Sequence, residues 1–559
     1  MLKKVLSKCL INNKLAAFLI ILGSISWSST MIKSGFKYEY GYGFWGANGY
    51  DGVWHIALIN NLARFNFENP VLSGELIKNY HIGFDLFIAI LHLITSIPVK
   101  TIYFQLFPPF ASIILGFLTY HFVYNWTKSI KSSLFALFFI YFGGSAAWIL
   151  NLGESAFWSQ QSISTLINPP FALSLIFILL GLIFMQKGKI LLAILSFGVL
   201  IQIKAYAAIL VLGGLFVSIF YSYILHHTSY ILKIFLGSLI LNLLLFFLVK
   251  NDGLSTFVWQ PFWFLETMFA ASDRLPWPKM AEAMLSYKNQ SVITKFILSY
   301  GLAFAIFIFG NFWTRLLLVK DLFKKIDLYK IFMLSIVLAG TIVPTFFVQT
   351  GTPWNTIQFM YYSLFFAGIL AGISVSQLVT YRKSIMLIVV LLTIPTSFFS
   401  LINNYLTKIP PAIVSNQELV ALDFLNMQED GVVLTYPFDT AYNPKQIPNK
   451  IPLFKYSNTS YVPAFSRKNI YFERTNVEIM GYNWEERRKK ALDFFITTDI
   501  DKAGEFLNKN KIKYLYLVKE MSPLYGELFK VDSSKLGLVK IFENEVSIIY
   551  KYDKNFGGS

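Results

Sequence analysis

"HIGFDLFIAILHLIT", residues 81–95, decides how the rest of this chain is placed in a membrane. The stretch is apolar enough to suggest a membrane span, but it is short and carries His81, Asp85 and His92. A span needs about 20 mostly apolar residues, and a stretch of about 10–14 is more often interfacial or re-entrant. We therefore predict a helix lying at the external surface. Counting it as a span would invert the predicted side of every later connector.

The composition explains why spans are expected at all. The 559 residues are 55% hydrophobic and only 14% charged, with a mean hydropathy of +0.54, whereas soluble domains are about a quarter charged. The net charge of +17 could indicate a nucleic-acid partner. The basic residues, however, fall in short connectors between apolar runs, where positive charge marks the cytoplasmic side. This distribution favours a membrane protein without a nucleic-acid partner.

The apolar runs predict about eleven spans. They lie at residues 15–27, 101–124, 133–150, 170–186, 190–203, 205–225, 231–249, 292–312, 331–349, 357–378 and 384–402. Connectors predicted to be cytoplasmic hold Lys128, Lys131, Lys187, Lys189, Arg315, Lys320, Lys324, Lys325, Lys330, Arg382 and Lys383. Connectors near 151–169 and 350–356, predicted to be external, hold no Lys or Arg.

The first apolar run has the order of a signal peptide, but we interpret it as an uncleaved span because a whole polytopic chain follows. Lysines before it place the N-terminus in the cytoplasm. The single cysteine, Cys9, excludes an intrachain disulfide.

Beyond residue 403 the sequence changes character. "QELVALDFLNMQEDGVVLTYPFD" predicts an amphipathic helix, a turn and a buried strand, "DKAGEFLNKNKIKYLYLVKE" repeats helix then strand, and the end of the chain predicts a hairpin. The predicted fold is an α-helical polytopic membrane protein with a C-terminal extracytoplasmic α/β domain. Residues 1–402 form the membrane domain, whose external loop is 33–100, and residues 403–559 form the α/β domain.

An acidic motif opens that external loop. In "NGYDGVWHIALINNLARF", residues 48–65, Asp51 precedes His55 by four residues, and His81 and Asp85 repeat the spacing. Residues four apart share a helical face, so each pair could face a cavity. Alternatively, Asp51 could be the N-cap of the helix that follows it.

Glu154 is the acid of the next external connector. It is the only charged residue between Lys131 and Lys187. It could be a solvated loop acid or a charge at a helix N-terminus. It could also act with Asp51 across a cavity, as a general base or as a metal ligand.

Two cations complete the set. Lys204 interrupts the apolar "SFGVLIQIKAYAAILVL", where a tight turn between helices is predicted. It could extend to the membrane interface, or bind a lipid phosphate, since ionisable groups at membrane depth are functional candidates. Arg274, in the aromatic-rich "FWFLETMFAASDRLPWP", suits an interfacial belt or a lid over a lipid-linked substrate. No Walker motif, zinc spacing or G-x-S-x-G elbow is present, which argues against ATP-driven transport.

These features resemble the GT-C superfamily of integral-membrane glycosyltransferases. The most similar branch contains protein O-mannosyltransferases and aminoarabinose transferases. The resemblance rests on "YDGVWHIALINNLARFNFENP" in the first loop, the interfacial "YHIGFDLFIAILHLI", Glu154, "GVLIQIKAYAAIL" with Lys204, and "TPWNTIQFMYYSLFFAGILAG". The sequence departs from the branch at Gly52, where a second acid is usual, at Tyr80–His81, and at Gln358–Phe359.

The resemblance implies transfer of a sugar from a polyprenyl-phosphate donor to an envelope acceptor on the outer membrane face, usually with inversion. Asp51 would be the general base, and Glu154 a second catalytic acid. His55, His81, Asp85, Lys204 and Arg274 would bind substrate. A divalent metal could be held by Asp51, Glu154 and His55. The alternatives are a flippase for lipid-linked saccharides, a secondary transporter, and a pseudoenzyme whose external domain binds envelope polymer.

Overall fold

The computed structural model describes residues 13–226, 230–249, 257–322, 324, 326–437, 451–456, 459–521 and 532–553. Cys9 and the first three lysines lie outside these residues, as do parts of the connectors at 225–230 and 250–291. The chain divides into two compact units. The helical unit comprises Met1–Met31, Phe107–Leu248 and Ser255–Leu406, and the mixed unit comprises Ile32–Leu106, Val249–Leu254 and Thr407–Ser559.

Helices long and apolar enough to cross a membrane number eight within the described residues. They are Val99–Thr127, Pro169–Gln186, Ala205–Ile224, Tyr230–Leu248, Ile293–Asp321, Leu328–Phe346, Pro353–Tyr381 and Ser384–Tyr405. Three further predicted spans appear as the shorter apolar helices Lys14–Ser28, Ile130–Phe142 and Ile190–Ile203. The chain is a multi-pass membrane protein, while the count of eleven spans and the side of each terminus stay predictions.

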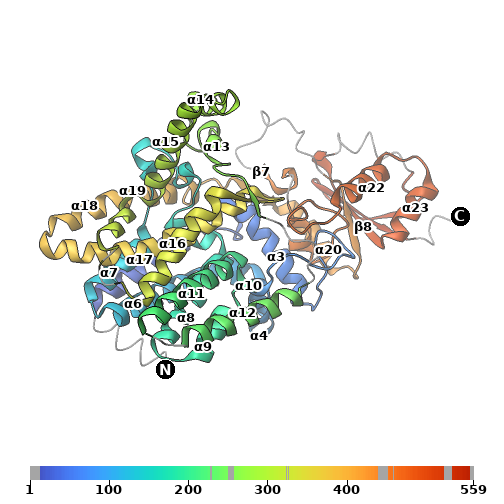
Figure 1. The fold of residues 1–559 in the computed structure, drawn as a ribbon. Helices are drawn as coiled ribbons and strands as arrows, with labels where there is room; N and C mark the ends of the chain where they lie inside the picture. Colours follow the sequence, from blue (N-terminus) through green and yellow to red (C-terminus); the bar gives the residue numbers. More distant parts are fainter. Residues whose placement is uncertain are drawn as a thin grey trace. The chain divides into compact units, whose positions relative to one another are not determined.

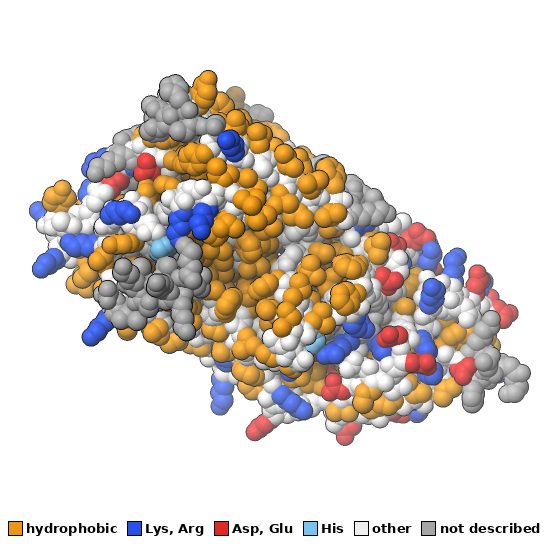
Figure 2. All heavy atoms as spheres, turned by 90° about the horizontal axis from the view of Figure 1, so that it is seen from below, with side chains coloured by type: hydrophobic (Ala, Val, Ile, Leu, Met, Phe, Trp, Pro, Cys, Tyr) orange, Lys and Arg blue, Asp and Glu red, His pale blue; other side chains and the backbone are white. Residues whose placement is uncertain are grey.

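The core of the helical unit forms where α17 (Gln358–Tyr381) packs against α7 (Ile130–Phe142) and α16 (Leu328–Phe346), and α16 also packs against α11 (Ala205–His226) (Figure 1). Small residues allow this approach: a Cβ at Gly340 would lie 2.7 Å from the Phe359 carbonyl oxygen. By contrast, α12 (Tyr230–Leu248) is mostly exposed and apolar, as expected of a helix that faces lipid. Figure 2 shows a broad hydrophobic face with few charged side chains over its centre.

The mixed unit combines the first external loop with the end of the chain. Its first sheet has the order β1-β2-β5-β7, from Lys37–Tyr38, Gly41–Phe44, Ala412–Ser415 and Ile451–Pro452. Strand β2 pairs antiparallel with β5, with Gly41 opposite Ser415. The units therefore differ from the predicted division at residues 402 and 403, because strand pairing groups the loop with the C-terminal segment.

The predicted C-terminal elements are present in a second sheet of order β6-β8-β10-β9. Strands β6 (Val432–Thr435) and β8 (Ile512–Val518) are parallel, and β9 (Leu538–Glu543) forms an antiparallel hairpin with β10 (Ser547–Tyr552). Four helices accompany the sheets: α20 (Asn416–Met427), α21 (Tyr461–Ser466), α22 (Trp484–Ile496) and α23 (Ile500–Lys509). A capping box between Ser415 and Glu418 starts α20.

Two helices of the loop carry the acidic motif, α3 (Asp51–Leu62) and α4 (Gly83–Thr95). Helix α3 is held by the C-terminal segment: Asn60 donates a hydrogen bond of 2.8 Å to the Ala464 carbonyl. Helix α4 lies within the predicted interfacial stretch "HIGFDLFIAILHLIT", residues 81–95. It has 13 residues and groups with the mixed unit, and it exposes Leu86, Ile90, Leu93 and Ile94. Such a face suits the interfacial position that we predict.

Candidate functional site

The acidic motif forms one cluster within the mixed unit. We predicted two pairs at i,i+4 spacing, Asp51–His55 and His81–Asp85. The ion pair in the structure joins one member of each: His55 Nδ1 lies 2.6 Å from Asp85 Oδ1. A contact between α3 and α4 therefore joins one member of each predicted pair.

The pair of His55 and Asp85 is buried, with 6% and 0% exposure. The Tyr103 ring stacks on the imidazole at 5.7 Å, and Phe84 meets it edge-on at 5.6 Å. Burial raises the pKa of Asp85, while His55 acts in the opposite direction. Among the described residues, Asp85 Oδ2 has no hydrogen-bond partner. Asp85 can thus hold the imidazole in one orientation, as a carboxylate does beside a catalytic histidine.

Asp51 differs from Asp85 because it is only half-buried. Helix α3 begins at Asp51, and its N-cap is Tyr50, without a side-chain capping bond. The N-cap interpretation is therefore wrong: Asp51 is in the first turn, not at the cap. Burial is the main cause that raises the pKa of Tyr50 and Tyr80, and Asp51 raises both further, after Asp85 in the case of Tyr80. Of the two acids, Asp51 is the one with solvent access.

The packing around Gly52 explains why this chain lacks the second acid that is usual at this position in the GT-C branch. A Cβ at this position would lie 2.8 Å from Phe104 Cζ and 3.4 Å from Tyr103 Cε1. A side chain at this position therefore requires the Phe104 ring to move. His81 follows Tyr80 in the chain, and its imidazole stacks on the Tyr80 ring, with the two ring centroids 4.8 Å apart.

Glu154 lies in the helical unit and is 5% exposed. One carboxylate oxygen accepts a 3.0 Å hydrogen bond from the Gln161 backbone N–H, and the other accepts from the Ser164 hydroxyl. Ser164 Oγ also lies 2.9 Å from the Tyr405 hydroxyl. The solvated loop acid is therefore ruled out. Glu154 belongs to a buried polar network.

Arg315 is a buried residue near this network, contrary to its predicted place in a cytoplasmic connector. We counted it in a cytoplasmic connector, but helical structure continues through η6 (Trp313–Asp321) and Arg315 is 1% exposed. It donates to Gln161 Oε1 at 2.8 Å and to Ser162 Oγ at 3.0 Å. Gly143 leaves the space, since a Cβ there would collide with the guanidinium. The signal that could have identified Arg315 is its position directly after the apolar run, with no turn residue between.

Titration of Glu154 should change the stability of the protein. Burial raises its pKa from 4.5 to about 7, so the protonated form is favoured in the folded state. This contribution is fully present below the unfolded pKa and is lost as pH rises through about 7, a change of about 3 kcal/mol. Glu154→Gln cannot titrate, so its Tm relative to wild type should be higher at about pH 8 than at about pH 5. Equal differences at the two pH values would contradict a buried, titrating carboxyl group.

Lys204 lies at the predicted turn. Helix α10 (Leu200–Ile203) ends before it, α11 begins at Ala205, and Lys204 itself is extended. The side chain is 6% exposed, and its Nζ lies 3.5 Å from Asn168 Oδ1. Asn168 also donates to Gln358 Oε1 at 3.3 Å. Gln358, one of the departures from the GT-C pattern, is thus linked to Lys204 through a single side chain.

Arg274 lies in an aromatic setting on the helical unit. Its guanidinium is 4.7 Å from the Trp158 ring centroid and donates a 2.9 Å hydrogen bond to Ser155 Oγ. The Trp158 ring also stacks on Trp354 at 4.7 Å. Aromatic contacts of this kind suit both an interfacial belt and a lid over a lipid-linked substrate. Through Ser155, Arg274 lies beside the loop that carries Glu154.

The predicted residues thus fall into two groups. The mixed unit holds Asp51, His55, His81 and Asp85, and the helical unit holds Glu154, Lys204 and Arg274. Of the predicted metal ligands, Asp51 and His55 lie in the mixed unit and Glu154 lies in the helical unit. Across the described ranges, no group of three or more His, Cys, Asp or Glu residues is arranged to hold a metal ion.

Comparison with solved structures gives similar chains. An oligosaccharyltransferase of Archaeoglobus fulgidus, in complex with Zn and sulfate, is 12% identical, with a TM-score of 0.49 over 90% of this chain and 68% of that one. ArnT from Cupriavidus metallidurans bound to undecaprenyl phosphate is 11% identical, with a TM-score of 0.39 over 98% of both chains. No protein-family model and no curated protein sequence matches this chain.

Proposed function

We propose that the chain is a membrane glycosyltransferase that moves a sugar from a polyprenyl-phosphate donor to an envelope acceptor on the outer membrane face. The observation that carries the proposal is the difference between the two acids of the cluster. Asp85 is fully buried against His55, whereas Asp51 stands half-buried in the first turn of α3. One acid is thus suited to orientation, and the other to proton transfer.

In this mechanism the acceptor hydroxyl attacks the anomeric carbon of the donor and gives its proton to the Asp51 carboxylate. The bond between the anomeric carbon and the phosphate oxygen breaks, and the polyprenyl phosphate leaves with that electron pair. The leaving group needs positive charge and no proton. His55, oriented by Asp85, and His81 bind the sugar or the phosphate. Glu154 is a second acid whose bonds to Ser164 and Gln161 suit hydroxyl recognition.

We assign the phosphate to Lys204 first and to Arg274 second. Lys204 is a buried cation in an apolar unit, where a phosphate would be attracted more strongly than in water. Arg274 already has an acid beside it, because its Nη1 lies 3.3 Å from Asp273 Oδ2.

Lys204→Met removes the charge while keeping the aliphatic length. We expect donor binding to weaken by about 1–3 kcal/mol, the range for a hydrogen bond to a charged group. Titration of a fluorescent polyprenyl-phosphate sugar into the variant, beside Arg274→Met, measures the change and ranks the two cations. Lys295→Met is a control on an exposed lysine. Unchanged donor affinity in Lys204→Met would leave Lys204 as an interfacial lysine.

Transfer itself is tested by incubating purified protein in lipid with a panel of radiolabelled polyprenyl-phosphate sugars and membrane extract. Label moving into an extractable glycan, lipid or protein supports the proposal. Movement of the labelled donor between leaflets, without a new glycosidic bond, would show a flippase and overturn it.

A further inference from the structure

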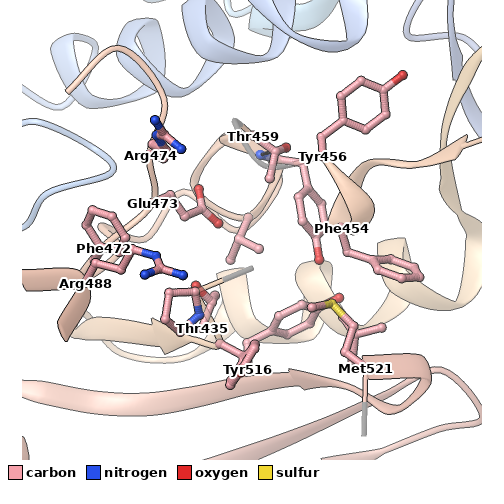
Figure 3. Close-up of a pocket in the computed structure, with 15 residues that line it drawn as sticks. Thr435, Phe454, Tyr456, Thr459, Phe472, Glu473, Arg474, Arg488, Tyr516 and Met521 are labelled. Carbon is pink, nitrogen blue, oxygen red and sulfur yellow. Dashed lines mark hydrogen bonds between the residues drawn. The ribbon is translucent and has the colours of Figure 1, made fainter. Parts of the chain in front are cut away.

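A polar cavity lies within the C-terminal part of the mixed unit, in residues that the proposed transfer does not use (Figure 3). Buried aromatic side chains form much of its wall, including Tyr461, Tyr516, Phe454 and Phe472. The open cavity has a volume of about 60 Å³. At roughly 15 Å³ for each water, it takes a group the size of several waters.

Glu473 is the buried carboxyl group that lines this cavity. It is 9% exposed, and its Oε2 has no hydrogen-bond partner among the described residues. Burial raises the pKa of Glu473 well above its usual value, so the protonated form can both donate and accept. A buried carboxyl group without a partner destabilises a folded domain unless something else binds it. Figure 3 shows the Glu473 carboxyl group in the cavity, among the labelled side chains.

The charged side chains around the cavity indicate which class of ligand it would bind. Arg474 lines it, but its guanidinium binds Glu478 at 2.9 and 2.6 Å and lies over Trp484. Arg488 also lines the cavity. Two guanidinium groups disfavour an ammonium ligand. Aromatic walls with a few placed polar groups are the usual composition of a small-molecule site, and a sugar offers apolar C–H faces and hydroxyl groups together.

We propose that this cavity takes the hydroxyl-bearing edge of one sugar ring of a saccharide, with hydroxyls bonded to Glu473 and the Thr435 hydroxyl, and with C–H groups against the tyrosine and phenylalanine walls. The site is separate from the Asp51 cluster and holds whether or not the chain is a transferase. With this site the mixed unit would bind envelope glycan.

The test measures sugar binding to the full chain purified in lauryldimethylamine oxide, because maltoside detergents carry competing sugar. The probes are the methyl glycosides of glucose, galactose, mannose and N-acetylglucosamine, followed by saturation-transfer NMR and by the shift in Tm. We expect at least one probe to bind wild-type protein, and Glu473→Gln and Glu473→Leu to weaken it at least about tenfold. Glu505→Gln, on the exposed side of α23, is the matched control and keeps binding.

Stability separates a binding role from a structural one. If Glu473 is kept for a ligand, Glu473→Leu removes an unpartnered buried carboxyl group, so the Tm without sugar should stay equal or rise. A lower Tm in both Glu473 variants would overturn the proposal, as would a wild-type protein that binds none of the four glycosides. Asp51→Asn should keep sugar binding while losing transfer, which distinguishes this site from the proposed active site.

Discussion

Asp51→Asn is expected to lower the turnover of sugar transfer by about 10²–10⁴-fold, the usual contribution of a positioned base, while Tm changes little. Asparagine keeps the shape of the side chain but cannot take the acceptor proton. Asp51 lies in the first turn of α3 and the N-cap is Tyr50, so the substitution leaves the capping residue unchanged. The lost charge near the helix N-terminus costs about 0.3–1 kcal/mol.

The measurement is transfer at saturating donor, with a thermal melt of the same sample. Asp501→Asn is the matched control, because Asp501 is an exposed acid in the first turn of α23. It removes a comparable helix-terminal charge without touching the cluster. Full transfer by a folded Asp51→Asn protein would remove Asp51 from the mechanism and turn the search for the base to the Asp85–His55 pair.

Asp85→Ala is expected to cost about 1–3 kcal/mol of stability, the range for leaving a buried polar group without its hydrogen-bond partner, and to reduce turnover as well. The substitution leaves His55 Nδ1 buried between Tyr103 and Phe84 without its partner at 2.6 Å. The imidazole then loses its fixed orientation. A melt in detergent and the transfer assay measure the two effects.

Asp85→Asn separates charge from geometry, because its amide oxygen can still accept from Nδ1–H. Its loss of Tm should be smaller than that of Asp85→Ala. Asp423→Ala, at an exposed acid of α20, should change neither quantity. An Asp85→Ala protein with wild-type Tm and turnover would show that the ion pair supports neither folding nor transfer.

Features set by local sequence were predicted well. Apolar length was enough to locate the eight long apolar helices of the described residues, the short 81–95 segment contains α4, and the turn at Lys204 falls where a lone charge interrupts apolar sequence. The C-terminal helix and strand pattern also appears, since alternation and turn residues are local signals.

Features set by contacts distant in sequence were not predicted. His55 and Asp85 are 30 residues apart, and nothing in either helix indicates the partner of the other. Arg315 was assigned by counting charges, which cannot distinguish a solvated connector from a buried helix extension. The strands β1 and β2 are short and rich in glycine and tyrosine, and they exist because β5 pairs with β2.

That pairing also sets the order in which the protein can be made. A ribosome synthesises β2 and α3 near the start of the chain, and it produces β5 and α21 only after nearly every membrane helix has been translated. Until then α3 has neither its sheet nor the Ala464 carbonyl that Asn60 binds. A nascent or truncated chain consequently carries the acidic motif in an unfinished unit. The contacts that hold α3 within the mixed unit therefore form only after the C-terminal segment has been translated.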